Sequence, residues 1–137
     1  MLITGGAKRV GAAICRRLHA SGANLMLHYR ASAGEARLLQ AELNHARANS
    51  VALIQADLLD TAKLASLIEQ TVQTFGGLDG LVNNAGGSPW KPFLQTSERL
   101  FEESFRFNVT SAFLLARLAV PHMLASGGGA IVNISSA

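Results

Sequence analysis

Cysteine is nearly absent from this sequence, which contains only Cys15 among its 137 residues. A single cysteine cannot form an intramolecular disulfide, so we expect a protein of the reducing cytoplasm. The sequence also lacks a run of 18 apolar residues, and its opening MLITGG has no charged segment followed by an apolar one. These absences predict a soluble protein without a membrane span or a secretion signal.

Charge of one sign is concentrated nowhere in the chain. The formal net charge is +3, and no run of five or six like charges occurs, which argues against the tails typical of nucleic-acid or membrane-surface binding. Hydrophobic residues make up 49% of a chain long enough for one core, so we predict a single domain over residues 1–137. We expect a small molecule as its partner and no metal site.

Short apolar segments alternate with helical patterns along the chain. The predicted strands are 1–4, 24–29, 50–57, a segment within 78–86, and 130–135, and the later helices are 61–75 and 97–126. Strands separated by crossovers of ten or more residues indicate a parallel sheet covered on both faces. The fold class is therefore α/β. A helical bundle is the alternative, and it leaves the glycines at the strand ends unexplained.

Glycines gather where the first predicted strand meets the first predicted helix, in TGGAKRVG at residues 4–11. Gly5 suits a tight turn and Gly11 suits close packing of the helix. Free N–H groups at the start of a helix favour a pyrophosphate. The usual G-x-G-x-x-G is absent, which weakens this interpretation. A simple turn at the start of a helix is the alternative explanation of these glycines.

This segment resembles the T-G-x-x-x-G-x-G fingerprint of the short-chain dehydrogenase/reductase family, with Arg9 in place of the middle glycine, as in its pteridine reductase branch. The likeness continues through HYRAS, QADLLD, GGLDGLVNNAGG, FNVTSAF and GGGAIVNISS. It implies an NAD(P)H-dependent oxidoreductase. It also implies a Rossmann-like three-layer α/β/α fold with a five-stranded parallel sheet in the order 3-2-1-4-5.

The resemblance places cofactor-binding residues at the ends of four strands. They are Gly5, Lys8, Arg9, Val10 and Gly11; Tyr29, Arg30, Ala31 and Ser32; Asp57 and Leu58; and Asn83, Ala85 and Gly86. Asp57 and Leu58 would contact the adenine, and Asn83, Ala85 and Gly86 would contact the sugars. For Asp57 a loop cap is the alternative, and for the fourth group a simple turn after a strand.

The end of the second strand bears on the choice of cofactor. Proteins that prefer NAD commonly have an acid there, where this sequence has Tyr29 followed by Arg30. Lys8 and Arg9 can converge on the same region, and Ser32 can donate a hydrogen bond. Because three cations without a nearby acid suit a 2′-phosphate, we predict that NADP(H) is preferred and that NAD(H) is possible.

The resemblance also implies catalytic roles for Asn108, which would support a proton-relay water, and Ser136, which would orient the substrate oxygen. In the family a tyrosine and a lysine follow about a dozen and sixteen residues after that serine. We expect a chain truncated before this Y-x-x-x-K pair, with diaphorase-like transfer from NADPH or NADH to quinones or dyes. An inactive nucleotide-binding or interaction module, or a fragment of a longer carbonyl reductase, is the alternative.

Two segments predict self-association. The fifth strand, AIVNIS, would lie at a sheet edge, and an uncovered apolar edge invites pairing with another chain. The long helix 97–126 carries more apolar side chains than one core face requires. We therefore predict a homodimer or higher oligomer formed through helix 97–126 or strand 130–135.

Overall fold

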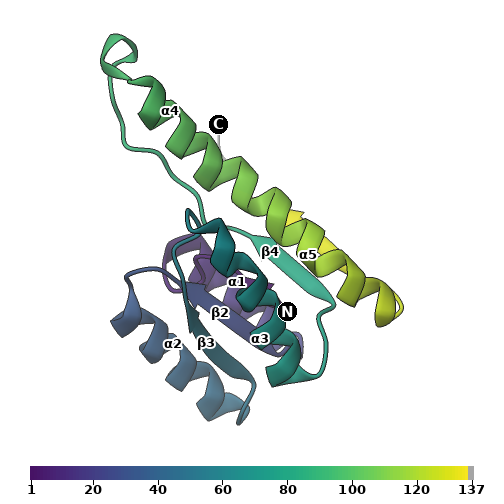
Figure 1. The fold of residues 1–137 in the computed structure, drawn as a ribbon. Coiled ribbons are helices and arrows are strands. Elements are labelled where there is room, and N and C mark those ends of the chain that lie inside the picture. Colours follow the sequence, from purple (N-terminus) through teal and green to yellow (C-terminus); the bar gives the residue numbers. More distant parts are fainter. Residues whose placement is uncertain (136–137) are drawn as a thin grey trace.

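Five parallel strands form the centre of the computed structural model, which describes residues 1–135 (Figure 1). The strands are β1 Leu2–Ile3, β2 Leu25–Tyr29, β3 Val51–Gln55, β4 Gly80–Asn83 and β5 Ala130–Asn133. Their order is β3-β2-β1-β4-β5, and every neighbouring pair is parallel. The predicted fold class and strand order are both confirmed.

Strand register places the candidate site. Ile3 in β1 lies opposite Leu27 in β2 on one side and Val82 in β4 on the other. Because the strands are parallel, their carboxyl ends meet at one edge of the sheet. The loop of Gly5 and Gly6, the segment after Tyr29 and the segment after Asn83 therefore lie at the same edge.

The helices follow the strands as crossovers. They are α1 Arg9–Ala20, α2 Ala33–Ala46, α3 Leu64–Phe75, α4 Glu98–Phe105 and α5 Ser111–Ala125, with short 3₁₀ turns at Thr61–Lys63 and Phe93–Gln95. Gly76 ends α3 with a left-handed backbone, φ 77°. The hydroxyl of Ser97 accepts the Leu100 N–H at 3.2 Å and caps α4. Ser32 occupies the cap position of α2, but its side chain makes no capping hydrogen bond.

The sheet lies between two layers of helices, and all four residues of its edge strand β5 are exposed. Leu2 belongs to a core cluster with residues of α3 and α5, whereas Ile3 belongs to a second cluster with residues of α1 and α2. Neighbouring residues of a strand point to opposite faces, so this split is expected for a sheet covered on both sides. The three-layer arrangement that the sequence implied is therefore present.

Cys15 lies inside the second cluster and has no exposed surface. Its Sγ donates to the carbonyl oxygen of Gly6 at 3.6 Å, and burial raises the pKa of the thiol to about 12. A thiol with so high a pKa is almost entirely protonated at neutral pH and is a poor nucleophile. Cys15 is a packing residue beneath the glycine loop.

The predicted helix 97–126 is one helical segment, in which a π-helical turn, η3 at Arg106–Thr110, joins α4 to α5. Figure 1 shows α4 and the loop before it projecting beyond the sheet, whereas α5 lies along it. No residue of α4 is buried. Phe101, Phe105, Val109 and Phe113 follow one another at four-residue spacing and are all exposed.

The same segment, Glu98–Ala125, is 28 residues long and has a window of mean hydropathy 1.2, which makes it long and apolar enough to cross a membrane. This differs from the expectation of no such segment. It is weak evidence for a span, because the core helix of a soluble protein can pass the same test. Among the described residues no other helix meets the criterion.

Candidate functional site

The loop between β1 and α1 is a tight turn built around two glycines. Gly5 has φ +62°, and a Cβ there would lie 3.0 Å from the Cα of Ala85. A Cβ at Gly11 would overlap the carbonyl oxygen of Gly5 and lie 2.7 Å from Nδ2 of Asn84. Both glycines therefore let the loop, the start of α1 and the segment after β4 approach more closely than any side chain allows.

Arg9 occupies the position that is glycine in the fingerprint, and its backbone keeps the conformation that favours glycine, φ +48°. A left-handed backbone costs a non-glycine residue about 1–2 kcal/mol. The side chain of Arg9 is exposed, at the first residue of α1. The loop thus keeps its shape under strain and carries an additional cation.

Thr4 and Asn84 hold the loop to the end of β4. The hydroxyl of Thr4 accepts the N–H groups of Asn84 and Ala85, each at 3.0 Å. The Asn84 side chain donates from Nδ2 to the carbonyl oxygens of Thr4 and Gly5, at 3.0 and 3.1 Å. Sequence reasoning missed both residues. They could have been identified as polar residues that directly follow two buried strands, since buried polar groups need hydrogen-bond partners.

His28 holds the loop from the other side, in β2, and was also missed. Its Nδ1 accepts the Gly5 N–H at 3.1 Å, and its Nε2 lies 3.1 Å from the carbonyl oxygen of Ala56. A carbonyl oxygen can only accept, so Nε2 carries the proton and the ring is neutral. Burial lowers the pKa of this imidazole, which favours the same neutral form.

The segment after β2 brings several predicted cofactor residues to the same edge. Arg30 and Ala31 are exposed, while Tyr29 and Ser32 are partly buried. The carbonyl oxygen of Arg30 accepts from Nε2 of Gln55 at 2.9 Å, which ties this segment to β3. The Arg30 guanidinium and the uncommitted Ser32 hydroxyl are thus available near the glycine loop.

Asp57 and Leu58 follow β3 and have different surroundings. The Oδ1 of Asp57 accepts the Leu59 N–H at 3.0 Å, which is the loop cap that the sequence left open as an alternative. Leu58 is 2% exposed and packs in the core cluster of α3 and α5. Its side chain therefore supports the sheet, and only its backbone can face an adenine.

The side chain of Asn83, predicted to lie beside the cofactor's sugars, is engaged with other parts of the protein, and its contact with a sugar stays a prediction. Its Nδ2 donates to Oδ1 of Asn133 in β5 at 2.9 Å and to the carbonyl oxygen of Ala112 at 3.4 Å. Its own Oδ1 is buried without a partner among the described residues. The side chain is engaged with β5 and α5, which leaves Ala85 and Gly86 as the small residues at this edge.

Asn108 lies in the π-helical turn and fixes the segment after β4. Its Oδ1 accepts the Gly87 N–H at 2.8 Å, and its Nδ2 donates to the carbonyl oxygens of Gly87 and Ser104 at 2.9 and 2.7 Å. A Cβ at Gly86 would lie 2.9 Å from that Oδ1. Its part in a proton relay stays a prediction, and Ser136 lies outside the described residues.

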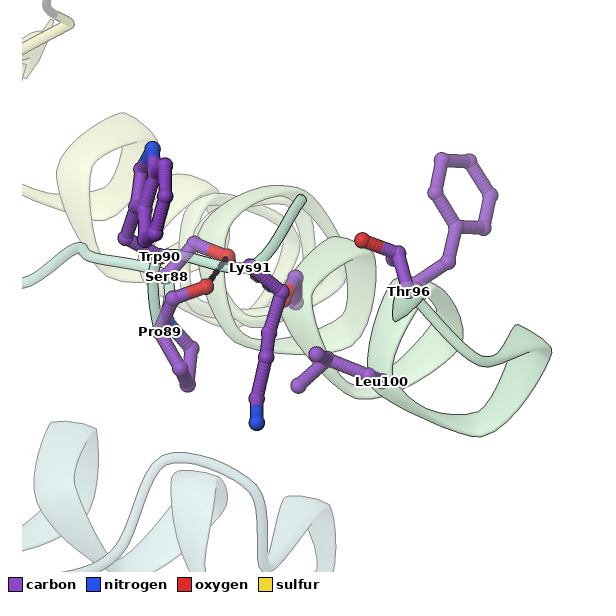
Figure 2. A pocket seen from close by; sticks show the side chains of 8 residues that line it. Ser88, Pro89, Trp90, Lys91, Thr96 and Leu100 are labelled. Atoms are coloured by element: carbon purple, nitrogen blue, oxygen red, sulfur yellow. Dashed lines mark hydrogen bonds between the residues drawn. The ribbon is translucent and has the colours of Figure 1, made fainter. Parts of the chain in front are cut away.

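A shallow pocket of about 340 Å³ lies between the segment after Gly87 and α4 (Figure 2). The Ser88 and Ser104 hydroxyls lie 3.0 Å apart in it, and Trp90 and Lys91 point to opposite sides of the loop. Ser104 also accepts from Asn108, so the pocket adjoins the asparagine. Within residues 1–135 no group of three His, Cys, Asp or Glu side chains is arranged to hold a metal ion.

Ion pairs between α1 and α2 correct one premise of the sequence analysis. Lys8 Nζ lies 2.8 Å from Oε1 of Glu35, in the first turn of α2, and this hydrogen bond lowers the pKa of the Glu35 carboxyl. The expectation of three cations with no nearby acid is therefore wrong for Lys8. Arg9 and Arg30 take part in no ion pair of the part of the chain that the structure describes.

A glycine turn after the first strand of a doubly wound sheet, beside a helix start without acids, defines a dinucleotide-binding fold. Residues 1–137 match the family model of the short chain dehydrogenases, and the chain belongs to this family. The family consists of oxidoreductases that use NAD(P)(H). The residues present fit such a cofactor, because Gly11 lets the start of α1 pack directly on the glycine loop and the first turn of α1 contains no acid.

Comparison with known proteins agrees with this family assignment. The chain is 41% identical to an uncharacterized oxidoreductase of Mycobacterium tuberculosis, over 98% of this chain and 51% of that protein. It is 34% identical to a tetrahydroxynaphthalene reductase of Pestalotiopsis fici, over 98% and 48%. A solved structure of a Serratia marcescens short-chain dehydrogenase/reductase mutant superposes with TM-score 0.91 at 35% identity, over 98% and 54%. The chain spans about half the length of the curated relatives it matches.

The strain at Arg9 predicts an unusual order of stabilities. Arg9→Gly and Arg9→Ala both remove the cation, but only glycine takes φ +48° without strain. We expect the glycine variant to have a free energy of unfolding about 1 kcal/mol above that of the alanine variant, measured by urea denaturation. At exposed Arg37, inside α2, the same pair should show the opposite order. Equal stabilities at Arg9 would contradict the strain.

The neutral His28 predicts a pH-dependent stability. Because the folded-state pKa is lowered, the unfolded chain binds this proton more readily, and the stabilisation is lost as the pH falls below about 6.5. We expect the wild-type unfolding free energy to fall faster from pH 7 to pH 5.5 than that of His28→Gln, by up to about 1.4 kcal/mol per pH unit. His45→Gln, which removes an exposed imidazole, is the control, and equal slopes for wild type and His28→Gln would refute the assignment.

Proposed function

We propose that the chain binds NADP(H) at the junction of β1 and α1, with NAD(H) as a second cofactor, and presents it to a small-molecule acceptor. The observation that carries this is the backbone of the glycine loop, where Gly11 packs against Gly5 and the residues at the start of α1, from Lys8 to Val10, are exposed. The first turn of α1 contains no acid. Its N–H groups and dipole therefore favour the pyrophosphate.

The charges near the loop support the preference for NADP(H). Arg9 and Arg30 are exposed, and the hydroxyl of Ser32 is not used as a helix cap. Tyr29 stands where an acid would receive the ribose of NAD. A 2′-phosphate brings about two negative charges, which guanidinium groups bind well.

The segment after β4, where the acceptor would bind, also supports the proposal of hydride transfer to a small molecule. When bound, the nicotinamide of such a cofactor supplies a hydride. Asn108 holds the backbone of Gly87 in place, and the pocket of Trp90 and Lys91 adjoins it. We infer that a flat acceptor such as a quinone or a dye lies against this segment.

The residues of the 137-residue chain favour acceptors that need no positioned proton donor. Tyr29 is its one tyrosine, it lies at the adenine end, and no Tyr-x-x-x-Lys is present in the chain. A simple ketone then lacks general acid–base assistance of about 10²–10⁴-fold. A longer protein containing this chain would reduce carbonyl groups, as the names of the relatives, hydroxynaphthalene and 3-oxoacyl-[acyl-carrier-protein] reductases, suggest.

The single buried cysteine fits a cytoplasmic location.

Binding and turnover test this proposal separately. We expect calorimetry to show tighter binding of NADPH than of NADH, and NADPH oxidation to proceed with menadione but not with a simple ketone. Gly11→Ala should abolish binding, because its Cβ overlaps Gly5, whereas Gly34→Ala, which meets no atom within 4 Å, should not. Binding without turnover would identify a nucleotide-binding module, and absence of binding would refute the proposal.

We also propose that the chain self-associates through its long helix. Phe101, Phe105 and Phe113 are 64%, 54% and 61% exposed, and they form a stripe with Val109 along α4, η3 and α5. β5 is an edge strand whose Ile131 and Val132 are also exposed, and it is the second candidate surface. An apolar stripe of this length is typical of protein–protein contacts.

We expect a dimer or larger oligomer in sedimentation equilibrium at micromolar concentration. Phe113→Glu should shift the equilibrium to monomer, because it places a charge within the stripe. Val132→Lys should have this effect only if the edge of β5 forms the contact. A monomeric wild-type chain would contradict both surfaces.

A further inference from the structure

The ion pair of Lys8 and Glu35 lies beside the region proposed to receive the 2′-phosphate. Lys8 is the cap residue of α1, next to Arg9, and Glu35 lies in the first turn of α2, three residues after Ser32. Their side chains are 2.8 Å apart and each is half exposed. The carboxylate of Glu35 is therefore already paired with one of the cations that a phosphate would need.

A second ion pair in the same groove provides a comparison. Arg16 and Glu42 also connect α1 to α2, through two hydrogen bonds of 2.7 Å, and both pairs line a groove of about 380 Å³. Arg16 follows Lys8 by eight residues, or about 12 Å along a helix. Both pairs join a cation to a glutamate with similar exposure, although Arg16 makes two hydrogen bonds to Glu42, and only Lys8–Glu35 adjoins the glycine loop.

The two cofactors make different demands on Lys8. NAD(H) has a ribose hydroxyl at the 2′ position, so it can bind with the Lys8–Glu35 pair intact. NADP(H) brings about two negative charges to the same place and draws Lys8 toward them. Exposed ion pairs are weak enough to be exchanged, but the released carboxylate then lies near the phosphate, which opposes binding.

We propose that Glu35 is a specificity-determining residue, whose carboxylate competes with the 2′-phosphate for Lys8 and so limits the preference for NADP(H) over NAD(H). This inference rests on the proposed cofactor site. It also assigns distinct roles to two neighbouring cations. Arg9 is available to the phosphate at once, whereas Lys8 becomes available only when it leaves Glu35.

Calorimetric titration of the full chain with NADPH and NADH tests the proposal. Glu35→Gln removes the competing charge, so we expect it to bind NADPH about threefold to fivefold more tightly with no change for NADH. Glu42→Gln, the matched control, should leave the ratio of the two affinities unchanged. In the Lys8→Gln background the effect of Glu35→Gln should be smaller, because the cation under competition is gone and only the repulsion between the carboxylate and the phosphate remains.

Three outcomes overturn the proposal. An unchanged affinity ratio in Glu35→Gln would show that the carboxylate does not compete. Weaker NADH binding in that variant would show instead that Glu35 accepts a hydrogen bond from the ribose. Binding of neither nucleotide by the unsubstituted chain would refute the proposed function and this inference with it, whereas the first two outcomes leave the proposed function standing. Thermal unfolding of each variant would check that the fold is retained.

Discussion

The close approach of three backbone segments at one edge of the sheet is the constraint on which the candidate site depends. Gly11 permits it, because a side chain there would overlap the carbonyl oxygen of Gly5. Thr4 and Asn84 then hold the loop to β4, and His28 holds it to β2. The turn is thus shaped by its own hydrogen bonds before any ligand arrives. A site that is already ordered loses little entropy on binding, which favours affinity.

These hydrogen bonds also decide which amides can meet a phosphate. The N–H of Gly5 is donated to His28 Nδ1 and that of Gly6 to the His28 carbonyl oxygen. Both are therefore engaged with β2. The first residues of a helix have N–H groups without intrahelical partners, so the donors for an anion lie at the start of α1, beside Lys8 and Arg9. The neutral ring of His28 places the turn, and the helix start provides the positive potential.

The fold was predictable because its signals are local. Apolar runs, helical periods and glycines at strand ends each occupy a few consecutive residues, and together they gave the α/β class and the position of the glycine loop, whereas the strand order came from the resemblance to the short-chain dehydrogenase/reductase family. The contacts that were missed join distant residues. Lys8 and Glu35 are 27 positions apart, and their pairing depends on how α1 packs against α2. Asn83 likewise finds Asn133 only once β5 is placed beside β4, and the burial of Leu58 depends on α3 and α5. Thr4 and Asn84 could have been identified from the sequence, because they are polar residues that follow buried strands.

The strained residue of the loop is also the one whose charge is not shared. Lys8 pairs with Glu35 and Arg16 with Glu42, while Arg9 belongs to no ion pair among the described residues. Its left-handed backbone persists because the glycine turn on one side and α1 on the other fix the chain around it. An arginine here disfavours the fold slightly and leaves a guanidinium at the helix start that a phosphate can take without breaking another contact. Glycine at this position would relieve the strain and leave Lys8, already occupied by Glu35, as the one cation of the loop.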